Sequence, residues 1–116
     1  MKNIIQDKSF AFALRMVKLC NHLQKAKRET IMSKQLLRCG TSIGANVAES
    51  KHAQSRADFI SKLTIALKEA AETDYWLRLL YESNYLSNVE FQSIFADCKE
   101  IESLFAAIVK TTKNNF

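Results

Sequence analysis

Four side chains in the middle of this sequence have types and spacings that could bind a metal ion or transfer a proton. Glu49 and His52 form a Glu-x-x-His pair, the pattern with which one helix of a di-iron bundle supplies two metal ligands. Glu69 and Glu72 are three residues apart, so on a helix their carboxylates would be neighbours able to bind a metal ion or share a proton. The chemistry that these residues suggest is that of a metal-dependent hydrolase.

A simpler interpretation accounts for the same residues. A di-iron site needs a second Glu-x-x-His and two more carboxylates, whereas the sequence has one such pair, with His52 at the predicted end of its helix. Neither His22 nor His52 has an adjacent nucleophile or orienting carboxylate. Glu69 and Glu72 would then pair with nearby polar side chains, for which the candidates are Arg38, Lys68, Arg78 and Asn46. We therefore predict no catalytic residue, no metal ligand and no cofactor, and keep the hydrolase as the least favoured alternative.

Both glycines of the chain lie in one short segment, and no proline occurs anywhere. Gly40, Gly44 and Ala48 recur every four residues, which places them on one face of a helix. Each glycine inside a helix lowers helix stability by about 1 kcal/mol relative to alanine. Close packing against another helix must therefore contribute more stability than this. The row predicts a tight helix crossing. A phosphate-binding loop is disfavoured, because no strand precedes the row and no Gly-Lys-Ser/Thr follows it.

The composition predicts a single all-helical domain over residues 1–116. With 47% hydrophobic and 25% charged residues the chain is ordinary for a globular protein, and so few glycines and prolines disfavour sheets. Three cysteines, far apart and without a Cys-x-x-Cys pair, indicate reduced thiols rather than disulfides or a zinc site. No apolar run is long enough to span a membrane, and no signal peptide is recognisable. We expect a cytoplasmic protein with no membrane partner.

Hydrophobic periodicity predicts four helices, over about residues 7–27, 33–52, 55–83 and 87–112. Asp7 and Ser33 are candidate caps for the first two helices, and capping boxes at Ser55 and Ser87 open the other two. Because the connections are short, the helices should form an antiparallel up-down-up-down four-helix bundle.

The predicted third helix is the longest, about 42 Å against about 30 Å for the first, at 1.5 Å per residue. It also carries apolar side chains beyond a single stripe, namely Ile65, Tyr75, Trp76 and Leu79. Surplus apolar surface of this kind marks interaction sites. We therefore assign Trp76, together with Gly40, Gly44 and Ala48, to helix packing and assembly, and expect another subunit to cover the third helix.

Positive charge is concentrated in the first half of the chain. Residues 1–62 contain twelve Lys/Arg and four Asp/Glu, a net charge of +8, whereas residues 63–116 contain five and eight, a net charge of −3. One helical face carries Lys8, Arg15, Lys18, His22 and Lys25, and a charged turn adds Lys27 and Arg28. Such a face is either merely solvated or a contact for nucleic-acid phosphates. The charge asymmetry fits an anionic partner or attraction between subunits.

Two segments resemble the hallmark of a bacterial four-helix bundle family. The first is SKQLLRCGTSIGANVAE over residues 33–49; the second is DFISKL over residues 58–63, followed by IALKEAAETDYWL over residues 65–77. The family is that of the intervening-sequence proteins of the large ribosomal RNA, and the accessory protein of diversity-generating retroelements looks like a relative. The resemblance extends from Lys8 to about Phe105, and Cys39 stands where the pattern usually has serine.

The resemblance implies a homopentameric ring of four-helix subunits and no catalytic residue. For the retroelement relative it implies binding of nucleic acid and of a reverse transcriptase through a basic surface. We therefore expect a non-enzymatic homo-oligomer that binds RNA or DNA weakly and without sequence preference. Its phosphate contacts would be Lys8, Arg15, Lys18 and Lys25, with Lys27 and Arg28 beside them. The alternative is a scaffold or adaptor for another protein, such as a reverse transcriptase, with the basic face serving solubility.

Overall fold

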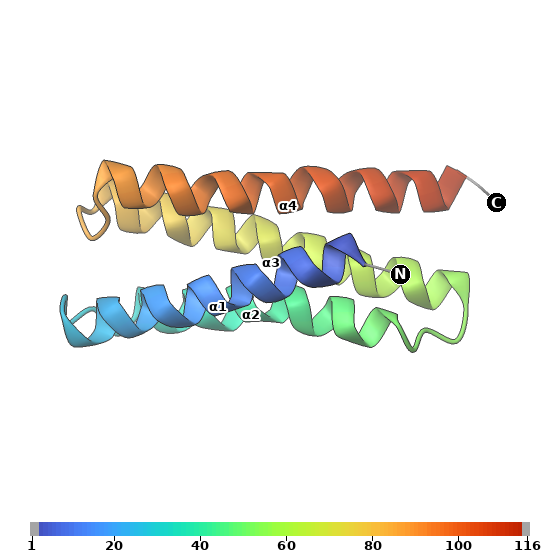
Figure 1. Cartoon of the computed structure of the whole chain (residues 1–116), viewed down its shortest axis with the longest axis horizontal. Coiled ribbons are helices and arrows are strands. Elements are labelled where there is room, and N and C mark those ends of the chain that lie inside the picture. Colours follow the sequence, from blue (N-terminus) through green and yellow to red (C-terminus); the bar gives the residue numbers. More distant parts are fainter. Residues whose placement is uncertain (1–2, 115–116) are drawn as a thin grey trace.

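The structure is a computed structural model and describes residues 3–114. This part of the chain forms four α-helices: α1 (Ile4–Lys25), α2 (Met32–Ser50), α3 (Arg56–Glu82) and α4 (Asn88–Asn114). Successive helices run antiparallel along a body of 48 × 25 × 21 Å (Figure 1). No strand occurs between residues 3 and 114. The predicted all-helical, up-down-up-down four-helix bundle is confirmed.

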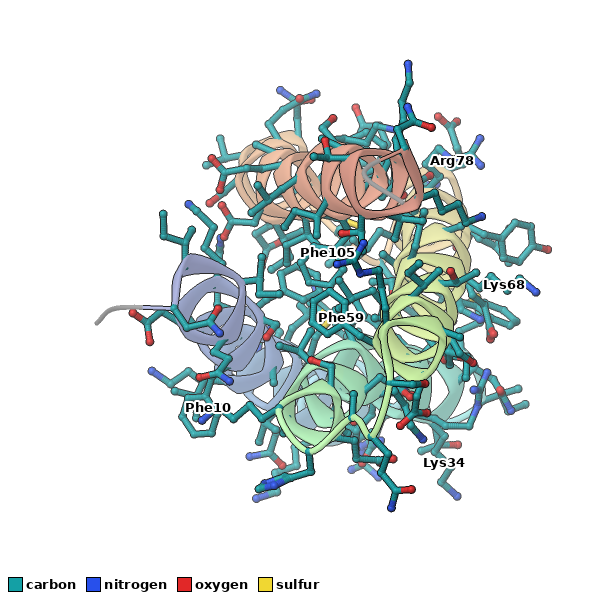
Figure 2. All side chains as sticks on the ribbon, turned by 90° about the vertical axis from the view of Figure 1, so that its right-hand side faces the viewer. Phe10, Lys34, Phe59, Lys68, Arg78 and Phe105 are labelled. Atoms are coloured by element: carbon teal, nitrogen blue, oxygen red, sulfur yellow. The ribbon has the colours of Figure 1, made fainter. Side chains whose placement is uncertain are left out.

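Each helix packs against the next one in the sequence, and α1 and α4 close the bundle. α2 contacts α1 on one side and α3 on the other, and α4 packs along α3, whereas the α1–α4 seam is the loosest of the four. Viewed along its long axis, the bundle has the side chains of Phe59 and Phe105 at its centre, while Phe10 and Lys68 project outwards (Figure 2). The loose seam is where the basic row of α1 meets α4.

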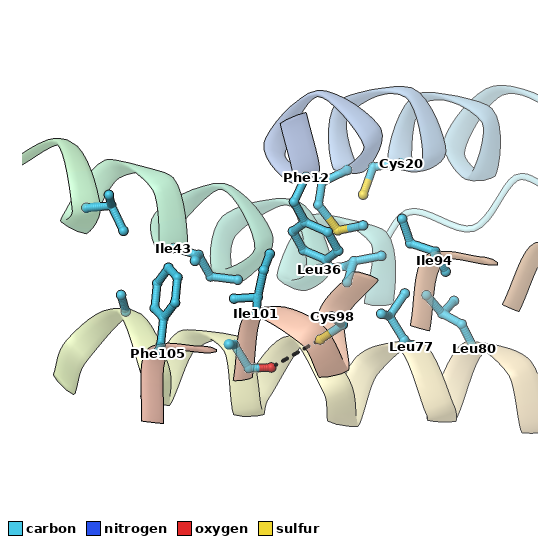
Figure 3. Packing of buried hydrophobic residues seen from close by; sticks show 14 of the residues in the cluster. Phe12, Cys20, Leu36, Ile43, Leu77, Leu80, Ile94, Cys98, Ile101 and Phe105 are labelled. Carbon is cyan, nitrogen blue, oxygen red and sulfur yellow. Dashed lines mark hydrogen bonds between the residues drawn. The ribbon is translucent and has the colours of Figure 1, made fainter. Parts of the chain in front are cut away.

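The core is built from apolar side chains of all four helices. Phe12 and Met16 of α1, Ile43 of α2, Leu77 of α3 and Phe105 of α4 are each at most 2% exposed. Figure 3 shows side chains from facing helices meeting in shared layers. Burying one such side chain is worth about 1.5–3 kcal/mol, so these periodic positions hold the four helices together.

The helix α1 begins one turn earlier than the sequence predicts. Its N-cap is Asn3, whose Oδ1 accepts a hydrogen bond from the Gln6 amide at 3.3 Å. An Asn side chain satisfies a free N–H of the first turn as well as an Asp does. Asp7 therefore lies inside the first turn, where its charge faces the positive end of the helix dipole. The prediction of Asp7 as the cap is wrong.

The start of α2 also differs from the prediction, because Ser33 lies inside the helix and is buried. The Glu29 carboxylate accepts hydrogen bonds from the amides of Met32, at 2.5 and 3.0 Å, and of Ser33, at 3.3 and 3.4 Å. The Ser33 hydroxyl instead donates to the Glu29 carbonyl at 2.8 Å. Arg28, with a left-handed φ of 58°, makes the turn just before Glu29. A carboxylate at the positive end of α2 thus replaces the predicted hydroxyl cap.

The predicted capping box at Ser87 is confirmed; at Ser55 the serine half forms, and the Asp58 carboxylate accepts from the Gln54 amide at 3.2 Å. At α3 the Asp58 amide donates to the Ser55 hydroxyl oxygen at 3.0 Å. At α4 the Glu90 amide donates to the Ser87 hydroxyl oxygen at 3.1 Å, and the Glu90 carboxylate accepts from the Ser87 amide at 2.9 Å. Both boxes satisfy amides that the first helical turn leaves free.

Helix length gives no reason for a second subunit to cover α3. The structure contains 27 residues in α3 and 27 in α4, and α4 packs along α3. The prediction that the third helix is the longest is therefore wrong, because α4 has the same length, whereas α1 and α2 are shorter, with 22 and 19 residues. The third helix begins one residue later and ends one residue earlier than predicted, and the fourth continues to Asn114 rather than to about residue 112.

Candidate nucleic-acid interface

The residues considered for a metal site do not come together. The helix α2 ends at Ser50, so His52 lies beyond it and is exposed, and the Glu49 carboxylate pairs with Lys62 of α3 at 2.9 Å. Within residues 3–114, no group of three or more His, Cys, Asp or Glu side chains is arranged to hold a metal ion. Glu49 is therefore the partner of a lysine on the neighbouring helix.

The α3 carboxylates Glu69 and Glu72 pair with Arg38 of α2, as the simpler interpretation predicts. The Arg38 guanidinium reaches Glu69 at 3.3 Å and also contacts Glu72. The Trp76 indole N–H donates to the Glu72 carboxylate at 3.0 Å, and the Tyr75 ring packs edge-on against Trp76 with centroids 5.0 Å apart. This network joins α2 to α3 and holds Trp76 in place, half-buried.

Gly40 and Gly44 let α1 approach α2 closely within one chain. A Cβ on Gly40 would stand 2.5 Å from Cγ and 2.7 Å from Sδ of Met16, and one on Gly44 would stand 3.3 Å from the backbone oxygen of Ser9. Ala48, the third member of the row, is exposed beside an open groove between α1 and α2. The tight helix crossing expected at this row is the crossing of α1 and α2.

The three cysteines offer no reactive thiolate. Cys20, Cys39 and Cys98 are free and buried. Burial raises the pKa of the Cys20 thiol to about 12 and that of Cys39 to about 11, and it also raises the pKa of Cys98. The Cys98 thiol donates to the Ala70 carbonyl at 3.6 Å (Figure 3). A thiol that stays protonated is a poor nucleophile, so these residues serve packing.

Two members of the predicted phosphate-binding set are already paired with carboxylates of α4. Lys8 Nζ lies 2.7 Å from Glu100 Oε1. Arg15 Nη1 lies 2.6 Å from Asp97 Oδ2, and the same guanidinium donates to the hydroxyl oxygen of Ser93 at 2.9 Å and to its carbonyl at 3.3 Å. These contacts bridge the loose α1–α4 seam.

The other four members are exposed and form no ion pair with any residue between 3 and 114: Lys18, Lys25, Lys27 and Arg28. Lys18 and Lys25 continue the α1 row towards its C-terminal end, and Lys27 and Arg28 follow in the connection to α2. Hydrogen bonds with Ser87 hold the pKa of Glu90 below its usual range, and the nearby side chains of His22 and Lys27 add to this effect. The free cations thus gather towards the end of the bundle where α1 ends and α4 begins (Figure 1).

Comparison with known proteins identifies the family. Residues 1–107 match the family described as 23S rRNA-intervening sequence protein. The chain belongs to this family. Its fold is similar to the crystal structure of a protein of unknown function from the S23 ribosomal protein family of Bacteroides thetaiotaomicron VPI-5482, with 53% sequence identity and a TM-score of 0.91. That alignment covers 93% of this chain and 96% of the other. No curated protein matches the chain.

The family resemblance expected from the two sequence segments is therefore confirmed, and neither comparison indicates an enzyme family. The family member described here has no helix between residues 3 and 114 that is long and apolar enough to cross a bilayer.

A second charged cluster of this family member joins α3 to α4. Asp74, only 8% exposed, accepts hydrogen bonds from Arg78 at 2.8 Å and from Lys99 at 3.0 Å, and Lys99 also pairs with Glu102 at 2.9 Å. Burial raises the pKa of Glu102, and a hydrogen bond to Asp74 adds to this. Burial also acts to raise the pKa of Asp74, but hydrogen bonds from Lys99, Glu102 and Arg78 outweigh it and lower that pKa. The i,i+4 and i,i+3 spacings were the signals available in the sequence.

Two apolar rows on the outside of the bundle are not covered by the chain itself. The row on α1 consists of Phe10, Leu14 and Val17. The row on α3 consists of Ile65, Tyr75 and Leu79. Phe10 and Leu14 border the groove between α1 and α2, which has a volume of about 410 Å³. Phe10 and Lys68, a neighbour of Ile65 on the α3 row, project on opposite sides of the bundle (Figure 2).

Proposed function

We propose that this chain is a non-enzymatic, self-associating protein of the cytoplasm that binds the phosphate backbone of RNA or DNA weakly and without sequence preference. The observation that supports nucleic-acid binding is the group of exposed cations without ion-pair partners in residues 3–114, formed by Lys18, Lys25, Lys27 and Arg28. Cations in this arrangement neutralise phosphates and release their counterions. The three buried, reduced thiols fit a reducing compartment.

A salt series tests the nucleic-acid proposal. Fluorescence anisotropy would measure the binding of labelled duplex DNA, duplex RNA and single-stranded RNA at several salt concentrations. For B-form DNA, log K should fall linearly with log salt, by about 0.9 for each neutralised phosphate. An affinity that is unchanged between low and moderate salt would contradict the proposal. Absence of any binding would favour the alternative, a scaffold for another protein.

A pair of charge-matched variants tests the place of binding. Changing Lys25, Lys27 and Arg28 to glutamine should weaken binding and reduce the salt slope. The control changes three other exposed lysines, which lie towards the opposite end of the bundle and form no ion pair within the described part of the chain: Lys51, Lys110 and Lys113. Both triple variants lose three positive charges. An equal loss of affinity in both would show that general charge, rather than this surface, binds the nucleic acid.

The two exposed apolar rows support self-association as the second half of the proposal. The rows lie on opposite sides of one chain, so the α1 row of one copy would meet the α3 row of the next. Head-to-tail contacts of this type close into rings when the rotation allows. The opposite net charges of the two halves of the chain favour the same arrangement. Five copies is the number that the family resemblance implies.

Complementation of two variants tests the head-to-tail contact. Leu14→Asp places a charge in the α1 row and Tyr75→Asp places one in the α3 row, and each variant alone should be a monomer by solution mass measurement. A mixture should form dimers, because each variant keeps one intact surface. Val89→Asp, at an exposed apolar position on α4 away from both rows, is the control and should assemble like the unchanged protein. A wild-type protein that stays monomeric at every concentration would refute self-association.

A further inference from the structure

The contacts between α1 and α4 place a row of acidic and polar groups against half of the basic row. Lys8 pairs with Glu100, and Arg15 is held by Asp97 and Ser93. Ser93, Asp97 and Glu100 recur at i, i+4 and i+7, so they lie along one face of α4. The partners are separated by 78 to 92 residues in the sequence, and the antiparallel packing of α1 and α4 sets their register. Each of these two α1 cations thus already has an anionic partner on α4.

These ion pairs are open to exchange with other anions. The side chains of Lys8 and Arg15 are each 40% exposed, and those of Asp97 and Glu100 are 46% and 57% exposed. Exposed ion pairs are worth only about 0–1 kcal/mol and are screened by salt. A polyanion that gains several such contacts at once can therefore displace the carboxylates.

The surface of the seam has room for the incoming groups. One hollow of about 220 Å³ is lined by Lys8, Asp97 and Glu100, together with apolar side chains. A second hollow of about 270 Å³ follows it along the seam and is lined by Arg15 and Lys18. The first hollow thus borders the paired Lys8, and the second borders both the paired Arg15 and the free Lys18.

The pairing of α1 cations with α4 carboxylates ends before Lys18 for a structural reason. The acidic residue that lines the second hollow is Glu90, and its carboxylate already accepts the Ser87 amide in the capping box of α4. Glu90 forms no ion pair with a cation in residues 3–114. The α1 row is therefore covered at Lys8 and Arg15 and free from Lys18 onwards.

We propose that Asp97 and Glu100 are built-in competitors of phosphate, so that the α1–α4 seam is a masked extension of the nucleic-acid interface. A nucleic acid first contacts the free cations and extends along the seam only where its phosphates displace the two carboxylates. This inference rests on the proposed function, and it explains how a strongly basic half of the chain would bind only weakly. The partner that fits the seam is a phosphate backbone, because it presents regularly spaced negative charges.

The test removes the negative charges of Asp97 and Glu100 without adding any cation. Asp97→Asn combined with Glu100→Gln should tighten binding and steepen the salt slope by up to about 1.8 on B-form DNA, which is about 0.9 for each unmasked cation. The control combines Asp7→Asn with Glu82→Gln, which changes the net charge equally, because neither carboxylate pairs with a cation in the described residues. The control should leave the slope unchanged. Circular dichroism checks that every variant is folded.

A second experiment tests whether the tighter binding of the Asp97→Asn, Glu100→Gln variant comes from the α1–α4 seam. Changing Lys8 and Arg15 to glutamine should cost little in the unchanged protein and should abolish the gain in the Asp97→Asn, Glu100→Gln background. If the unmasked variant behaves like its charge-matched control, the masking is refuted while the proposed function stands. If neither the unchanged protein nor any variant binds nucleic acid, the proposed function itself fails.

Discussion

Gly40 of α2 lies directly against the side chain of Met16 of α1, so that a Cβ at this glycine would stand 2.5 Å from the Met16 Cγ. Met16 is fully buried, and the α1–α2 contact is among the most extensive in the bundle. One turn further, Gly44 faces the Ser9 backbone oxygen. The glycine row is thus used inside the subunit, and the apolar side chains Phe10, Leu14 and Val17 on α1 remain exposed.

Gly40→Ala is predicted to lower the free energy of unfolding by about 1 kcal/mol. Overpacking of a core costs about 1–3 kcal/mol, and the better helix propensity of alanine returns about 1 kcal/mol. Urea unfolding followed by circular dichroism measures the difference. Gly44→Ala is the matched control. It should hardly change the free energy of unfolding, because the new Cβ would require Ser9 to move by only a few tenths of an ångström. In a Met16→Ala background, Gly40→Ala should no longer destabilise; an unchanged cost there would show that Met16 is not the obstacle.

The features of the fold that the sequence predicts are those that rest on local spacing. Apolar periodicity locates four helices, and the boxes at Ser55 and Ser87 join residues only three positions apart. The cap of α2 is harder, because Glu29 reaches the helix only through a left-handed turn at the preceding residue. The same holds for the candidate interface. Its cations can be identified in the sequence, but the pairing of Lys8 with Glu100 cannot, because these residues are 92 positions apart. No local sequence pattern predicts which cations form ion pairs in the folded chain.

Replacing the α2 cap should destabilise the protein without touching its apolar core. Glu29→Ala removes the carboxylate that binds the amides of Met32 and Ser33, and loss of a helix cap costs about 0.5–2 kcal/mol. Because Glu29 is buried, we expect the upper part of that range. Glu29→Gln keeps an acceptor oxygen at the same place and should recover part of the loss. Equal unfolding free energies for the alanine variant and the unchanged protein would contradict this role.

Asp74 should contribute stability that disappears in acid. Its pKa is lowered in the folded state, so the contribution is present above the unfolded value of about 3.9 and is lost as the pH falls through the folded pKa. Asp74→Asn would leave Arg78 and Lys99 without their shared carboxylate, and the expected loss at pH 7 is about 1–3 kcal/mol. Unfolding measured at pH 7 and pH 3 should show a smaller difference between the variant and the unchanged protein at pH 3. A difference that grows in acid would rule out this assignment.

Glu102 should have the opposite pH dependence. Its pKa is raised in the folded state, mainly by burial, so its contribution is fully present below the unfolded pKa of about 4.3 and is lost as the pH rises through the folded value. Glu102→Gln keeps a donor for Asp74 and carries no charge, so the stability of the variant relative to the unchanged protein should rise between about pH 4.5 and pH 7. Glu82→Gln, at an exposed carboxylate without an ion pair in residues 3–114, is the control and should show no such trend. If the Glu102→Gln difference stays constant over this range, the carboxyl pair of Asp74 and Glu102 does not titrate as the geometry of α3 and α4 implies.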